Sequence, residues 1–177
     1  MAPPTPDTMT ATHAIQPIII IKESAYIVKG YIGKYTEGIN DFWMYRERNN
    51  SVIDSIVIHD NLIQYIMDSL EWIPSKNPSL QGTPSGRGIN YHGETLFDIH
   101  SSETLISIFS SWKSLIKNAP DKFELTGEFV YSEADNQEGD YKKSVFNRDE
   151  VITQFEKIIL MSEALAKGEF YLYHFGI

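Results

Sequence analysis

The chain has 177 residues, 42% of them hydrophobic, which is typical of a globular domain with a sizeable core. It contains no cysteine, which excludes disulfides, cysteine zinc sites, iron–sulfur clusters and a thiol nucleophile. Its net charge of −9 disfavours nucleic acid and anionic lipid as partners. The sequence has no apolar stretch long enough to cross a bilayer and no signal-peptide pattern, so we expect a cytoplasmic protein.

The N-terminal part predicts a disordered leader followed by strands. Residues 1–14 are rich in Pro, Thr and Ala without any period, which is typical of disorder. The β-branched and aromatic runs that follow predict strands at 15–22, 25–33 and 41–47. Residues 51–58 read as a further strand, although a helix is also compatible with their composition.

The middle of the chain alternates helical and extended patterns. Apolar residues with helical spacing predict a helix over 62–73, capped near His59 and ended by Pro74. The glycine-rich segment 75–88 predicts a long loop, and residues 89–99 predict a hairpin or a strand kinked at Gly93. A second helix is expected over 103–116.

The last third predicts a hairpin, a helix and a buried strand. Residues 123–133 alternate, with Phe123, Leu125, Phe129 and Tyr131 on one face and Glu124, Thr126, Glu128 and Ser132 on the other. Residues 134–140 read as the turn and 141–147 as the returning strand. Asn147 starts a helix over 149–168, with Gly168 as its C-cap. The apolar run 170–177 predicts a strand inserted within a sheet.

The order of these elements indicates an α+β fold. We expect a mostly antiparallel sheet with about three helices packed on it, forming one domain over residues 15–177. The order of the strands within the sheet is not predicted.

The glycine-rich segment raises the question of a ligand site. It contains "GTPSGRG" but lacks the lysine of a phosphate-binding P-loop, and no helical pattern follows it. A loop of about this length often marks a binding site, and the other interpretation is a plain surface connection. If a pocket lies under residues 75–88, as in a small-ligand-binding domain or an enzyme, we expect Arg87, His92 and Glu94 to line it.

No pattern of catalytic or metal-binding residues stands out. The five histidines show none of the spacings that place two metal ligands on one helix face. There is no GxSxG nucleophile elbow, although a catalytic triad assembled from distant residues stays compatible with the sequence. We therefore predict no metal, no cofactor and no catalytic residue.

Acidic residues concentrate towards the C-terminal end. Residues 121–177 carry 12 acidic and 6 basic side chains, and residues 128–140 carry five acids and no base. Such a surface favours a basic protein partner, because carboxylates pair with arginine and lysine. The predicted contact residues are Glu124, Glu128, Glu133, Asp135, Glu138 and Asp140.

Three stretches resemble a group of bacterial proteins. The runs "LEWIP", "SWKSLIKNAPDKFELTGEF" and "FYLYHFGI" are similar to immunity proteins encoded beside polymorphic or contact-dependent growth inhibition toxins. The resemblance covers residues 60–177 and implies a protein that binds and blocks its cognate toxin. A basic toxin, for example a nuclease, would match the acidic surface, and the chain itself would contact neither nucleic acid nor membrane.

Overall fold

The structure is a computed structural model, and it describes residues 39–46, 51–131 and 139–176. The predicted leader at 1–14 and the strands expected at 15–22 and 25–33 lie outside the described residues. Within them, the chain forms an α+β domain with a mostly antiparallel sheet, as the sequence predicts.

The main sheet has six strands in the order β2-β1-β8-β5-β3-β4. Its described pairings are all antiparallel. The strands are β1 (Ile39–Arg46), β2 (Ser51–His59), β3 (Pro74–Lys76), β4 (Ser85–Arg87), β5 (Glu94–Phe97) and β8 (Phe170–Phe175).

The C-terminal strand β8 lies inside this sheet, between β1 and β5. Leu172 and Tyr173, which point to opposite faces, are both buried, so each face of β8 is covered. This confirms the prediction of an inserted strand. Residues 51–59 are also confirmed as a strand.

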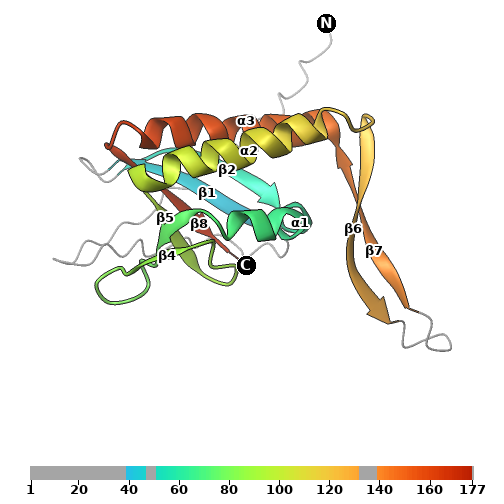
Figure 1. The fold of residues 1–177 in the computed structure, drawn as a ribbon, viewed down its shortest axis with the longest axis horizontal. Coiled ribbons are helices and arrows are strands. Elements are labelled where there is room, and N and C mark those ends of the chain that lie inside the picture. The colour runs from blue at the N-terminus through green and yellow to red at the C-terminus, as the bar shows by residue number, and fades with distance from the viewer. Residues whose placement is uncertain (1–38, 47–50, 132–138, 177) are drawn as a thin grey trace, which may run out of the picture.

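Three α-helices occur in the described part of the chain: α1 (Asp60–Leu70), α2 (Ser102–Ile116) and α3 (Arg148–Leu165). A short 3-10 helix, η2 (Ile99–Ser101), precedes α2. Helices α2 and α3 lie side by side on one side of the sheet (Figure 1). Phe109 of α2 and Phe155 of α3 are fully buried and meet edge to face, with ring centroids 5.4 Å apart.

The helix boundaries follow local signals in the sequence. The His59 Nδ1 atom accepts a hydrogen bond from the Asn61 amide at 3.1 Å and so caps α1. The Asn147 side chain accepts from the amides of Asp149 and Glu150 at the start of α3. Beyond the end of α3, Gly168 has φ +72°, the left-handed conformation that favours glycine at this position.

The prediction of a structureless loop over 75–88 is wrong. This segment contains β3 and β4, which pair from Pro74 opposite Arg87 to Lys76 opposite Ser85 and extend the main sheet. Helix α1 ends at Leu70, with Glu71 as its C-cap, so the predicted helix end at Pro74 is wrong and Pro74 begins a strand instead. The two strands have three residues each, and such short runs carry no period that a sequence pattern reveals.

A second, two-stranded sheet consists of β6 (Lys122–Tyr131) and β7 (Gly139–Asn147). Figure 1 shows this pair extending away from the layers formed by the main sheet and the helices. We call these two strands the arm.

Candidate protein-binding surface

The arm is anchored to the domain at its base. Phe123 of β6 and Phe146 of β7 are opposite one another and both buried, with ring centroids 5.9 Å apart. The His59 ring, which caps α1, meets Phe146 edge to face at 5.5 Å. The base therefore belongs to the hydrophobic core, whereas most residues further along the arm are exposed.

A β-bulge divides the arm into two parts. Thr126 pairs with Lys143, but the next pair along the ladder is Phe129 with Tyr141, so Gly127 and Glu128 together face one residue of β7. Such an insertion reverses the faces that later residues occupy. Phe129 and Tyr131 consequently lie on the face of Glu124 and Thr126, which we call the outer face.

The predicted alternation is therefore wrong beyond Thr126. Phe129 and Tyr131 do not continue the buried face of Phe123 and Leu125, and Glu128 does not share a face with Glu124. A regular alternation counts one residue per step, whereas Gly127 introduces an extra one. A glycine inside a strand pattern is a known signal for a bulge, and it is the signal that could have revealed this change.

The outer face carries a cluster of exposed apolar side chains. Phe129, Tyr131, Tyr141 and Val145 are 45%, 73%, 51% and 62% exposed. The Phe129 ring centroid lies 5.2 Å from that of Tyr131 and 5.0 Å from that of Tyr141, both edge to face. We call Phe129, Tyr131 and Tyr141 the aromatic patch; Val145 lies nearer the base of the arm on the same face. Apolar residues gathered in this way are typical of protein interaction sites, where Tyr and other aromatic residues are enriched.

Gly139 makes room for the aromatic patch. A Cβ atom at this position would overlap the Cε1 and Cζ atoms of the Phe129 ring. The ring therefore lies directly over the Gly139 backbone, which fixes it between its two tyrosine neighbours.

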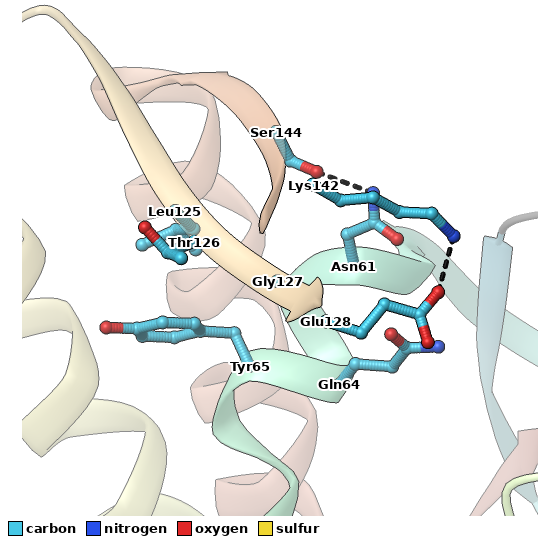
Figure 2. A pocket seen from close by; sticks show the side chains of 9 residues that line it. All are labelled: Asn61, Gln64, Tyr65, Leu125, Thr126, Gly127, Glu128, Lys142 and Ser144. Carbon is cyan, nitrogen blue, oxygen red and sulfur yellow. Dashed lines mark hydrogen bonds and ion pairs between the residues drawn. The ribbon is translucent and has the colours of Figure 1, made fainter. Parts of the chain in front are cut away.

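The inner face of the arm meets α1 across a small cavity of about 190 Å³. Figure 2 shows Asn61, Gln64 and Tyr65 of α1 on one side and residues of both arm strands on the other. The Asn61 amide donates to Ser144 Oγ at 2.6 Å, and Lys142 forms an ion pair with Glu128. The Asn61 bond joins the inner face of the arm to α1, and the ion pair joins β6 to β7 on that same face.

The predicted acidic contact residues are not all equivalent. Glu124 is exposed on the outer face, and Asp140 is exposed at the far end of β7. Glu128 lies on the inner face beside Lys142. Glu133, Asp135 and Glu138 lie outside the described residues. Lys122, Lys142 and Lys143 offset the described carboxylates, so the excess negative charge of the arm comes from residues 132–138.

The residues proposed for a pocket under the 75–88 segment are dispersed. Arg87 is exposed on β4, and β3 separates that strand from β5, which carries Glu94. Burial raises the pKa of the Glu94 carboxyl. His92 is exposed and meets Tyr91 edge to face at 4.8 Å. Among the described residues, no hydrogen bond or ion pair joins these three side chains.

A polar network that the sequence did not reveal links α1 to the segment before β5. The Tyr91 hydroxyl donates to the buried Asp60 carboxylate at 2.6 Å, and Gln64 Nε2 donates to the same carboxylate at 3.1 Å. Burial and the bond to Asp60 raise the pKa of Tyr91 to about 12, so this hydroxyl stays a donor. The network holds the segment before β5 against the start of α1. Asp60 and Tyr91 are 31 positions apart in the chain, so no local pattern reveals their contact.

Further properties of the described residues bear on function. None of their helices is long and apolar enough to cross a membrane. No group of three or more His, Cys, Asp or Glu side chains in the same residues is arranged to hold a metal ion. Comparison of the chain with known protein families, with curated proteins and with solved structures finds no match.

Proposed function

We propose that the chain is a binding protein that blocks a basic protein partner, and that the aromatic patch on the arm is the centre of the contact surface. The observation that carries this proposal is a set of exposed aromatic side chains, packed together on strands that project from the domain. A tyrosine or phenylalanine has few rotatable bonds and a large apolar area, so burying it against a partner costs little conformational entropy.

The charge of the arm supports a basic partner. Residues 128–140, which include the connection between the two strands, carry five acids and no base. Acidic groups beside an apolar contact mainly raise the association rate and select the partner, while the apolar contact provides most of the affinity. The chain as a whole, at net −9, attracts the same class of protein.

A protein toxin is the partner that this combination fits best. An inhibitor needs an exposed binding surface rather than a deep pocket with convergent polar groups, and the projecting arm meets that need. The resemblance to toxin-neutralising immunity proteins favours the same class. A nuclease, whose active site is basic because it binds phosphates, would be complementary in charge to the acidic residues of 128–140.

The proposal is tested with the protein encoded beside this chain's gene as the candidate partner. Replacing Tyr131 and Tyr141 with alanine removes two patch residues that are largely exposed. We expect at least a tenfold loss of affinity, because interface hot spots cost about 2 kcal/mol or more when truncated. The matched control is Leu160→Ala in the C-terminal half of α3, where the side chain is 61% exposed.

Affinity and thermal stability are measured together for the two variants and the wild type. The proposal requires lost binding with an unchanged melting temperature in the tyrosine variant, and neither effect in the control. Unchanged affinity of the tyrosine variant for a partner that binds wild type would exclude the aromatic patch as the interface.

A further inference from the structure

A second aromatic surface lies between the end of α1 and the outer side of α2. It is a groove of about 510 Å³, a volume within the range of ligand-binding sites. The lining residues are Ser69, Trp72, Glu103, Thr104, Ser107, Ile108, Ser111 and Trp112. Trp72 lies two residues beyond the end of α1 and is 63% exposed, which is unusual for the largest aromatic side chain.

The second tryptophan of the groove is held in place by its neighbours. The Trp112 Nε1 atom donates to Ser69 Oγ at 2.9 Å, and Ser69 Oγ in turn donates to the Ile66 carbonyl at 2.7 Å. The Tyr65 ring meets Trp112 edge to face at 5.9 Å. These contacts satisfy the indole N–H and fix the ring, so Trp112 offers a preformed wall rather than a mobile side chain.

The charge of the groove is negative. Glu103 is the charged residue among the eight that line it, and it is exposed at the start of α2. The nearest lysine along α2, Lys113, forms an ion pair of 3.6 Å with Glu156 of α3 instead. Two indole rings and a carboxylate together favour a cation, since tryptophan is the aromatic side chain that attracts cations most strongly.

We propose that this groove binds the guanidinium group of an arginine side chain from a basic protein segment. Arginine fits better than lysine, because its planar group stacks on aromatic rings and pairs with a carboxylate at the same time. Thr104, Ser107 and Ser111 place hydroxyl groups along the α2 side of the groove, as acceptors for guanidinium N–H groups that Glu103 leaves unpaired. An uncharged apolar ligand would make no use of the Glu103 carboxylate.

The groove is continuous with the surface near the arm. Tyr65 lines the cavity under the inner face of the arm and also contacts Trp112. A protein held by the aromatic patch could therefore place a basic side chain in the groove. The idea that this arginine belongs to the protein bound by the arm rests on the proposed function. Arginine binding by the groove itself is tested without that protein.

The test uses the full chain and a fluorescein-labelled peptide with alternating glycine and arginine, measured by fluorescence anisotropy at low salt. A peptide with citrulline in place of arginine is the matched ligand control, because citrulline has nearly the same shape without the charge. Trp72→Leu removes the ring but keeps an apolar side chain, and Glu103→Gln removes the charge but keeps the shape. Leu160→Ala and Glu163→Gln make equivalent changes at exposed positions of α3.

We expect the arginine peptide to bind more tightly than the citrulline peptide. Trp72→Leu should weaken arginine binding by about threefold to tenfold, in keeping with a cation–π contact, and Glu103→Gln by a similar factor. The two α3 variants should bind like wild type. The proposal would be overturned if the arginine peptide did not bind, or bound no more tightly than the citrulline peptide. It would also be overturned if the groove variants and the α3 variants lost equal affinity for the arginine peptide.

The outcome is separable from that of the proposed function. The variant with alanine at Tyr131 and Tyr141 should bind the arginine peptide like wild type, since neither residue lines the groove. Loss of toxin binding in that variant therefore tests the arm, and loss of peptide binding in Trp72→Leu tests the groove.

Discussion

The position of Gly139 under Phe129 allows the aromatic patch to be broken without changing any of its residues. In Gly139→Ala, the new Cβ would overlap the far end of the Phe129 ring and would lie 3.0 Å from the Val130 carbonyl oxygen. The ring can rotate away, but it then leaves both tyrosines. Each edge-to-face pair contributes about 0.5–1.5 kcal/mol, so the two contacts of Phe129 amount to about 1–3 kcal/mol of local stability.

This loss should be confined to the arm, because the aromatic patch lies outside the core formed by the main sheet and the helices. We expect the melting temperature to change by less than about 4 °C, which corresponds to about 1 kcal/mol for a chain of this size. Hydrogen exchange of the β6 and β7 amides beyond the bulge should become about tenfold faster or more. Mass spectrometry of peptic fragments resolves this part of the arm from its base.

Gly127→Ala is the matched control in the same arm. Its Cβ would lie 3.6 Å from the Lys142 carbonyl oxygen and 3.7 Å from the Lys142 Cβ, which are ordinary contacts. A double-mutant cycle identifies the cause, since Gly139→Ala should have little effect once Phe129 is alanine. The reasoning would be refuted if both glycine variants accelerated exchange equally. It would also be refuted if Gly139→Ala accelerated exchange as much in the Phe129→Ala background as in the wild type.

Three predictions concern the domain itself. Phe155→Ala should lower the free energy of unfolding by about 3–5 kcal/mol in chemical denaturation, because this side chain is fully buried against Phe109. Truncation after Gly168 removes β8 from between β1 and β5, so the product should be insoluble or unfolded; a cooperative melting transition would show otherwise. Burial lowers the pKa of His174 from 6.5, its value in the unfolded chain, to about 4. Between pH 6.5 and pH 4 the unfolded state therefore binds a proton that the folded state does not, so the protein becomes less stable as the pH falls through this range. Unfolding free energies should be about 2 kcal/mol lower near pH 5 than near pH 7.5, and His174→Gln should lose most of this pH dependence.

Periodic patterns in the sequence were sufficient for the larger elements. The helical spacing around Phe109 and Phe155 and the continuous apolar run of β8 predict elements that the structure contains, because each pattern reflects burial on one face or on both. Asn147 marked the start of α3, because capping depends on neighbouring residues alone. The predicted C-cap at Gly168 is wrong, since α3 ends at Leu165 with Ala166 as its C-cap and Gly168 lies in the turn that follows.

Features that depend on pairing between distant residues were not predicted. Strands β3 and β4 are too short to show a period, and they form because they add to a sheet that already exists. The bulge at Gly127 exchanged the faces of Glu128 and Phe129, so the sequence predicted an acidic outer face where the structure has an aromatic one. The groove between α1 and α2 brings together Trp72 and Trp112, which are 40 positions apart in the chain.

The central claim is that the outer face of the arm contacts a basic protein partner, and photo-crosslinking tests it most directly. The photoreactive residue p-benzoylphenylalanine replaces Tyr131, 73% exposed, in one preparation and Leu160 of α3, 61% exposed, in another. After irradiation with the protein from the neighbouring gene, we predict a covalent complex from position 131 and none from position 160. A complex that co-purifies but crosslinks only from position 160, or from neither position, would contradict the claim.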